Sequence, residues 1–278
     1  MPPPPGEGKK INMSPDLIFL LMLALRMAVA ASFVVTASFI AERSGPVIGA
    51  LVATLPISAG PAYAFLALDH DAAFIAQGAL TSLPINAATI SLGLVYVLLA
   101  QRHNLAVSFL TAAAVWIAIA SVIASLQWSL WGGLLLNAAA FAICTPVMQR
   151  YRHARMPPVA RRWYDVPFRA SLVAVLVAAV VTLSGRVGPS LSGILALFPA
   201  VFSSMMLILH PRIGGKATAA VIANSAWGLM GFGLAFVVLH LGASRFGSAM
   251  GLSLALATCV IWNLALWQIG RRRARVAR

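Results

Sequence analysis

The chain has 278 residues, of which 61% are hydrophobic and only 9% are charged. A soluble domain carries about 25% charged residues, and so few ionisable groups could not cover the surface of a soluble fold of this size. The net charge of +14 would suit a nucleic-acid-binding protein, but most basic residues lie in predicted loops and tails, where membrane topology places them. The composition therefore predicts an integral membrane protein whose partner is the lipid bilayer, with no nucleic acid bound.

The apolar segments of the sequence are continuous and about 20 residues long, the length that a helix needs to cross the hydrocarbon core. Strands of an outer-membrane barrel would alternate apolar and polar residues instead. We therefore predict an all-α membrane protein of about nine transmembrane helices.

The first half of the chain begins with a disordered tail, 1–15, that contains four consecutive prolines. A first four-helix unit is expected at 16–126, followed by a connecting transmembrane segment at 127–148. Pro56 and Pro61 are expected to interrupt the second helix. The five helices of this half are predicted at 17–40, 46–68, 72–100, 105–125 and 129–148.

A polar linker, 149–166, holds five arginines and is the strongest change of composition in the chain. It separates the first half from a second four-helix unit at 167–270, which a basic tail at 271–278 follows. The helices of this unit are predicted at 168–184, 189–210, 217–241 and 247–269. Arginine and lysine are enriched in cytoplasmic loops, so the arginines of the linker and the tail place both segments in the cytoplasm and the N-terminus outside.

The two halves resemble each other at one fixed offset. Five matches share that offset: Arg26 with Arg169, Arg43 with Arg186, Gly45-Pro46 with Gly188-Pro189, Ala53 with Ala196, and Pro56 with Pro199. The four spans of the first unit and the connecting helix together make an odd number of spans. The second unit therefore enters the membrane from the opposite face. The sequence thus predicts two inverted-topology repeats joined by a central helix, an arrangement common in secondary transporters.

The prolines inside the second and seventh predicted helices are candidates for a binding site. Pro56 and Pro199 each lie about ten residues into a helix, where proline removes a backbone hydrogen bond and frees a carbonyl group. Small and hydroxyl residues follow in both copies, among them Ser58, Gly60 and Ser203. Two broken helices at matching positions favour a substrate site, although a kink that only improves packing is the alternative.

Charged and amide side chains inside the helices are the other candidates. Arg26 lies well inside the first predicted helix, and its repeat mate Arg169 lies near the start of the sixth. Both could hold an anionic group, or they could extend toward the head groups. Thr81 and Asn224 occupy equivalent repeat positions, and either a polar pocket or ordinary hydrogen bonding between helices would explain them.

The sequence lacks the patterns of catalytic and metal sites. All six acidic residues fall in tails, loops or helix ends, which argues against a carboxylate-based proton relay or a divalent cation site in the membrane. No zinc-protease motif, nucleophile elbow or phosphate loop is present. We therefore expect no catalytic residue, no metal and no cofactor, and we do not expect an enzyme.

The segment Ser192-Gly193-Ile194-Leu195-Ala196-Leu197-Phe198-Pro199 resembles a motif of the small GlpM-like bacterial membrane proteins. These proteins are about as long as one repeat unit here, and the resemblance covers roughly the second half of the chain. It implies a bacterial inner-membrane location and a link to envelope polysaccharide production, without naming a substrate.

The leading prediction is a secondary transporter that moves a small polar or anionic solute by alternating access. The runner-up is a non-transporting inner-membrane factor that supports envelope polysaccharide biogenesis through partner contacts. A channel ranks third. The expected partners are the bilayer and a small-molecule solute, and a homodimer is left open.

Overall fold

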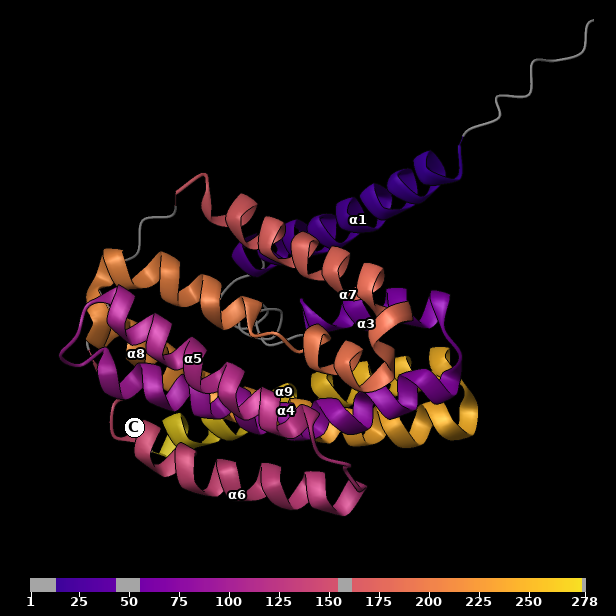
Figure 1. Cartoon of the computed structure of the whole chain (residues 1–278). Coiled ribbons are helices and arrows are strands. Elements are labelled where there is room, and N and C mark those ends of the chain that lie inside the picture. The colour runs from indigo at the N-terminus through magenta and orange to yellow at the C-terminus, as the bar shows by residue number, and fades with distance from the viewer. Residues whose placement is uncertain (1–13, 44–55, 155–161, 277–278) are drawn as a thin grey trace, which may run out of the picture.

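The computed structural model describes residues 14–43, 56–154 and 162–276. Within these residues the fold is entirely helical and contains no strand. The helices shown in Figure 1 are α1 (Pro15–Arg43), α3 (Ala59–Asp69), α4 (Ala72–Leu99), α5 (Leu105–Ala124), α6 (Leu130–Gln149), α7 (Asp165–Ala196), α8 (Ala200–Phe246) and α9 (Ser248–Val276). Seven of them, all except α3, are long and apolar enough to cross a membrane. The chain is thus built as a multi-pass membrane protein, as its composition predicts.

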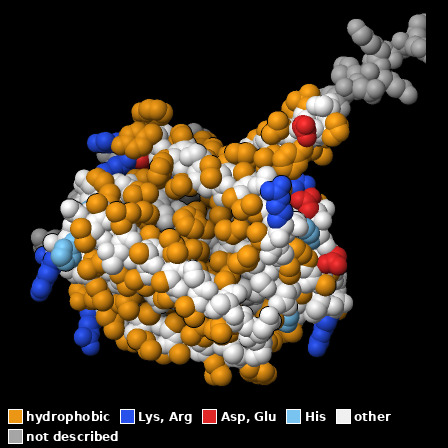
Figure 2. Space-filling model, viewed as in Figure 1, with side chains coloured by type: hydrophobic (Ala, Val, Ile, Leu, Met, Phe, Trp, Pro, Cys, Tyr) orange, Lys and Arg blue, Asp and Glu red, His pale blue; other side chains and the backbone are white. Residues whose placement is uncertain are grey.

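The surface agrees with a membrane location. Figure 2 shows charged side chains gathered mainly at two opposite ends of the molecule, with hydrophobic side chains over most of the face between them. Leu110 of α5, Leu135 of α6 and Ile261 of α9 are 63%, 70% and 67% exposed, respectively. Side chains of this size and exposure are stable against lipid and costly against water.

Helix α4 forms the centre of the bundle and packs against α5, α6, α7 and α8. Every residue from 78 to 90 is buried, and this stretch is rich in small and hydroxyl side chains that let neighbouring backbones approach. A Cβ atom on Gly193 would overlap the carbonyl oxygen of Gly78, so α7 crosses α4 in backbone contact. The Ser82 hydroxyl joins the same crossing, because it donates to the Gly193 carbonyl at 2.9 Å and bonds the Tyr63 hydroxyl at 2.7 Å.

Helices α4 and α8 run antiparallel where they pack. The start of α4 lies beside the end of α8, because the His240 ring nitrogen Nδ1 is 2.8 Å from the carbonyl oxygen of Ala76. The end of α4 lies beside the first residue after a kink in α8, because a Cβ on Gly215 would overlap the Ala100 carbonyl oxygen. The two ends of this helix pair correspond to the two ends of the molecule.

Glycines with positive φ angles kink α7 and α8. Gly188 has φ 75° and ψ 179°, and Gly214 has φ 81° and ψ 163°, a backbone region open essentially to glycine alone. Pro189 follows the first kink and begins a short helical segment, 189–196, which we call the first half-helix; proline fits that first turn because it has no N–H group to satisfy. The kink at Gly214 ends a second half-helix, 200–213.

The predicted helix boundaries are partly met. Predicted helices 72–100, 105–125 and 129–148 match α4, α5 and α6 closely, and side chains of Asp71, Asn104 and Ser129 cap their first turns. In the second half, α7 and α8 each run across a kink and join stretches that were predicted as separate helices. The described residues therefore form eight helices, seven of them long enough to cross a membrane, where about nine transmembrane helices were predicted.

The second predicted helix, 46–68, lies partly outside the described residues. Its described part is α3, and here one expectation is wrong: Pro61 does not interrupt the helix. Pro61 is the third residue of α3, within the first turn, where the missing N–H group costs no hydrogen bond.

Candidate functional site

The structure places both prolines singled out from the sequence at helix boundaries: Pro199 lies in a break between two helices, and Pro56 lies just before the start of one. The first half-helix ends at Ala196, residues 197–199 are not helical, and α8 begins at Ala200. Pro199 causes this break because it has no N–H group and disfavours helical geometry at Phe198. Helical hydrogen bonding resumes after Pro199, where the Ser203 amide donates to the Pro199 carbonyl at 2.8 Å.

The start of α3 after Pro56 has the same local form as the start of α8 after Pro199. Residues 56–58 are not helical, α3 begins at Ala59, and the Gly60 amide donates to the Pro56 carbonyl at 2.8 Å. Neither the N-cap of α3, Ser58, nor the N-cap of α8, Pro199, makes a side-chain capping hydrogen bond in the described structure. The positive ends of two helices are therefore left without a capping side chain.

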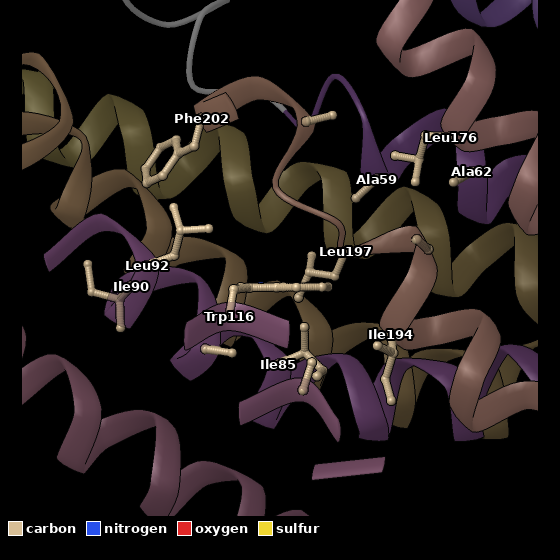
Figure 3. Close-up of a cluster of buried hydrophobic side chains, with 14 of the residues drawn as sticks. Ala59, Ala62, Ile85, Ile90, Leu92, Trp116, Leu176, Ile194, Leu197 and Phe202 are labelled. Carbon is tan, nitrogen blue, oxygen red and sulfur yellow. The ribbon is translucent and has the colours of Figure 1, made fainter. Parts of the chain in front are cut away.

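Both helix starts border one cavity of about 250 Å³, which we call the central cavity. Residues 57–59 line it at the start of α3 and residues 197–202 at the start of α8, while α1, α4, α7 and the later part of α8 complete the wall. The close-up in Figure 3 shows part of the buried apolar cluster here, in which the Trp116 ring extends toward Leu197. Trp116 also meets Phe198 edge to face, at 5.6 Å between ring centroids. Apolar side chains thus support the segment that carries Pro199.

The polar groups of the central cavity are few. They are Ser38, Ser58, Asn86, Thr89, Arg169, Ser204 and Ser225. Three hydroxyls donate to carbonyl groups of their own helices: Thr89 to Ile85 at 3.2 Å, Ser204 to Val201 at 2.7 Å, and Ser225 to Val221 at 3.0 Å. A hydroxyl whose proton is used in this way can accept a hydrogen bond from a ligand but has none to donate.

Arg169 is the one ionisable group among the described residues that line the central cavity. It lies in the first turns of α7 and is partly buried. Guanidinium groups remain protonated in proteins, so Arg169 contributes a permanent positive charge to the cavity wall. Together with the N-termini of α3 and α8, which carry partial positive charge, Arg169 makes the cavity favourable for an anion.

The structure brings Ser58, Arg169 and Pro199 of the predicted site together around the central cavity. Pro56 and Gly60 instead line a neighbouring apolar groove. Their positions differ because the chain turns between Pro56 and Ala59, so the proline ring and the following residues face different spaces.

The other predicted polar residues make local contacts and do not line the central cavity. Ser203 is buried next to the lining residue Ser204. The Thr81 hydroxyl donates to the Gln77 carbonyl at 3.3 Å, and the Asn224 amide donates to the carbonyls of Ala220 and Arg152 at 2.9 and 3.3 Å. Thr81 thus bonds within its own helix, and Asn224 bonds its own helix and the turn after α6, so neither makes the hydrogen bond between two helices that was the alternative explanation.

Arg26 lies away from the central cavity. It pairs with both carboxylate oxygens of Asp69 at the end of α3, with Nη2 donating to Oδ1 at 2.6 Å, and its guanidinium lies 5.8 Å from the centre of the Phe65 ring. Its contacts join α1 to α3. The repeat mates Arg26 and Arg169 therefore occupy different environments, because Arg212, not an acid, stands at the position equivalent to Asp69.

The sequence analysis did not single out Thr89, Ser38 or Asn86 as site residues, although all three line the central cavity. The Asn86 amide does join helices, donating to Asn137 Oδ1 at 3.2 Å and to the Leu229 carbonyl at 3.0 Å. The signal that could have found it is spacing: Ser82, Asn86 and Thr89 recur at intervals of four and three, which places them along one face of α4.

Within the described residues, no group of three or more histidine, cysteine or acidic side chains could hold a metal ion. Comparisons with protein-family models, with curated proteins and with solved structures found no match to this chain. The GlpM-like resemblance of residues 192–199 stays a prediction, and the function has to be argued from the geometry.

Proposed function

We propose that this chain is a secondary transporter that carries a small anionic solute through the central cavity by alternating access between two inverted halves. The observation that carries the proposal is the shared position of two helix N-termini, those of α3 after Pro56 and of α8 at Pro199, on one cavity that Arg169 also lines. Irregular backbone at membrane depth is tolerated where it lines a cavity, and broken helices with their N-termini toward an anion recur in secondary transporters.

The helix boundaries support the proposed repeat. Helix α4 begins at Ala72 and the continuous part of α8 begins after Gly214, while α5 begins at Leu105 and α9 at Ser248. Both pairs of starting points differ by the offset that separates Arg26 from Arg169. Since α4 and this part of α8 run antiparallel, a rotation that superposes one half on the other would turn it over in the membrane. The matches Arg43, Gly45-Pro46 and Ala53 lie wholly or in their side chains outside the described residues.

Two ion pairs support the same relation. Arg26 of α1 binds Asp69, which immediately precedes α4, and Asp165 of α7 binds Arg212, which immediately precedes the kink at Gly214. Asp69 and Arg212 occupy equivalent positions under the repeat offset, and their partners Arg26 and Asp165 lie one helical turn from equivalent positions. The two ion pairs therefore join α1 to α3 and α7 to the second half-helix at opposite ends of the molecule, with the charges exchanged.

The orientation that we propose keeps the linker and the C-terminus in the cytoplasm. In this orientation the end of the bundle where Ala100 lies against Gly215 faces the cytoplasm, and this end carries Arg102 and Lys216. His70 lies against Ser184 at the other end, with a hydrogen bond of 2.8 Å. The GlpM-like resemblance favours the bacterial inner membrane as the location.

The solute class follows from the charge and size of the central cavity. A cavity of about 250 Å³ falls just below the range of roughly 300–1,000 Å³ that holds drug-sized ligands. One guanidinium and two helix N-termini favour a single anionic group, and the hydroxyls are placed close to where such a group would lie. We therefore propose a small solute, or a small anionic moiety, as the group that occupies the cavity.

The test is uptake of radiolabelled or fluorescent anions into proteoliposomes that contain the purified chain, compared with Arg169→Gln. Removing the guanidinium should reduce saturable uptake at least tenfold, since an ionic hydrogen bond of about 1.5–3 kcal/mol is lost. Arg245→Gln is the matched control, because Arg245 is exposed at a helix end and should leave uptake unchanged. Equal uptake by the original chain and Arg169→Gln, or no uptake of any anion in the panel, would overturn the proposal.

A further inference from the structure

A second, larger space lies beside the central cavity. This groove has a volume of about 500 Å³ and is bordered by α1, α3, α8 and α9, and we call it the lateral groove. Val29, Leu68 and Leu256 line it and are each about half exposed or more. The groove therefore opens sideways, through the apolar surface that faces lipid, and not toward an end of the molecule.

The lateral groove is apolar in its chemistry. Its described lining contains no arginine, lysine, histidine or acidic residue. Its two hydroxyl groups are engaged, since Tyr63 bonds Ser82 at 2.7 Å and Ser253 donates to the Ala249 carbonyl at 2.9 Å. Several lining residues have small side chains that leave room for a ligand, among them Gly60, Ala64 and Ala235. A water-soluble anion gains nothing from such a surface, whereas a hydrocarbon chain would be well solvated there.

The two spaces are adjacent. Ala59 and Phe232 line both the central cavity and the lateral groove. Ala59 is the first residue of α3, three residues after Pro56, and its side chain is a single methyl group. A ligand that extends past Ala59 and Phe232 would pass from the positively charged cavity directly into the apolar groove.

We infer that the ligand of this site is an amphipathic anion, namely a lipid with an anionic head group. The head group lies in the central cavity beside Arg169 and the N-termini of α3 and α8, and the hydrocarbon chain lies in the lateral groove. The inference rests on the proposed function and specifies its substrate class. Charge complementarity selects the head group, and the continuity of the groove with the cavity selects a chain attached to it.

The repeat adds a consequence for the path of the lipid. The groove is built from α1, α3, the later part of α8, and α9, whose repeat equivalents are α7, the second half-helix, α4 and α5. Exchange of the conformations of the two halves would open the equivalent groove among those elements, at the opposite leaflet. The head group would then cross the membrane through the central cavity while the chain stays in hydrocarbon.

The test uses the full chain in phosphatidylcholine nanodiscs and follows its thermal midpoint by tryptophan fluorescence. The probes are monododecyl phosphate, dodecanol, dodecyltrimethylammonium and inorganic phosphate. We expect a saturable rise in the midpoint with monododecyl phosphate, a rise only at much higher concentration with inorganic phosphate, and none with the neutral or cationic amphiphile, because binding needs the anion and the chain together.

Two substitutions separate the head-group site from the chain site. Ser253→Trp places a large ring in the groove from an exposed position of α9. It should weaken the binding of monododecyl phosphate about tenfold or more and leave the binding of inorganic phosphate unchanged. Ala257→Trp, also exposed on α9 but outside the groove lining, is the control and should bind like the original chain. Arg169→Gln should abolish the response to both phosphates.

The outcomes distinguish this inference from the proposed function. If inorganic phosphate and monododecyl phosphate bind equally well and Ser253→Trp changes neither, the lipid inference is wrong while the anion site stands. If dodecanol binds as well as monododecyl phosphate and Arg169→Gln has no effect, the groove is a site for apolar molecules, and both the inference and the anion site are wrong.

Discussion

Polar side chains within the helices meet partners on other helices. Arg26 joins α1 to α3 through Asp69, and Arg212 joins α8 to α7 through Asp165. The first pair is the more exposed, with side chains 20% and 30% accessible, whereas both side chains of the second are 11% accessible. A charge left alone in such a place costs more as its burial increases, so the two pairs should differ in their effect on stability.

We therefore expect Asp165→Asn to lower the thermal midpoint of the purified protein more than Asp69→Asn does. Loss of the more exposed pair should cost about 1–2 kcal/mol and loss of the more buried pair about 2–4 kcal/mol. The measurement is thermal unfolding of the variants in one detergent, followed by tryptophan fluorescence. Asp71→Asn is the control: Asp71 is an exposed N-cap that accepts from the Phe74 amide at 2.8 Å, and asparagine caps equally well. A cost for Asp71→Asn equal to that of Asp165→Asn would contradict the argument.

Individual elements are shaped by backbone contact as much as by side chains. The first half-helix crosses α4 with Gly193 against Gly78, and a Cβ atom on Gly193 would overlap the Gly78 carbonyl oxygen. Backbone atoms of two packed helices cannot give way as the end of a flexible side chain can. A Cβ atom on Gly185 of the same helix α7 would instead point into open space, with no neighbouring atom of the described residues within 4 Å. The room around α7 therefore differs sharply between these two glycines.

Gly193→Ala should consequently destabilise the fold by about 1–3 kcal/mol, because it forces α7 and α4 apart. Gly185→Ala is its matched control and should be neutral or stabilising by up to about 1 kcal/mol, since alanine is the better helix former. Both effects can be measured as shifts of the thermal midpoint, with the amount of folded protein in the membrane fraction as a second readout. An equal loss for the two variants would show that helix propensity, not the crossing, governs both positions.

The whole molecule has two ends that the helix packing defines. Antiparallel packing of α4 and α8 brings the start of one to the end of the other, so Asp71 shares an end with Arg245, and Arg102 shares the opposite end with Lys216. All four side chains are exposed. One residue of each pair comes from each proposed half, as two units of opposite orientation require.

Cysteine labelling tests this arrangement in cells. In a background of Cys144→Ala and Cys259→Ala, both buried free cysteines, Asp71→Cys and Arg245→Cys should react with a membrane-impermeant maleimide in intact cells. Arg102→Cys and Lys216→Cys should react only after permeabilisation, because basic loops stay in the cytoplasm. Reversal of both pairs would leave the antiparallel packing intact and overturn the orientation, whereas labelling of Asp71→Cys and Arg245→Cys from opposite sides would contradict the packing itself.

Much of the helix content could be read from the sequence alone. The length of the apolar segments predicts the spans, because the hydrocarbon core has a fixed thickness. Asp71 and Asn104 mark the starts of α4 and α5 as side-chain caps, and Pro199 marks a break because it cannot donate a backbone hydrogen bond. Gly188-Pro189 indicates a helix start at 189, which the structure has, but the structure places that start after a kink inside α7 and not after a loop.

Only the tertiary structure decided which of the polar residues meet. The sequence favoured Arg26 as an anion contact, yet Asp69 binds it, while Arg169, Asn86 and Thr89 line the central cavity. The reason is physical: lipid and protein interior are both apolar, so the pattern of hydrophobic residues does not tell the buried face of a transmembrane helix from its lipid-facing side. Membrane helices were determined by composition and length, and the position and chemistry of the cavity between them were determined by packing.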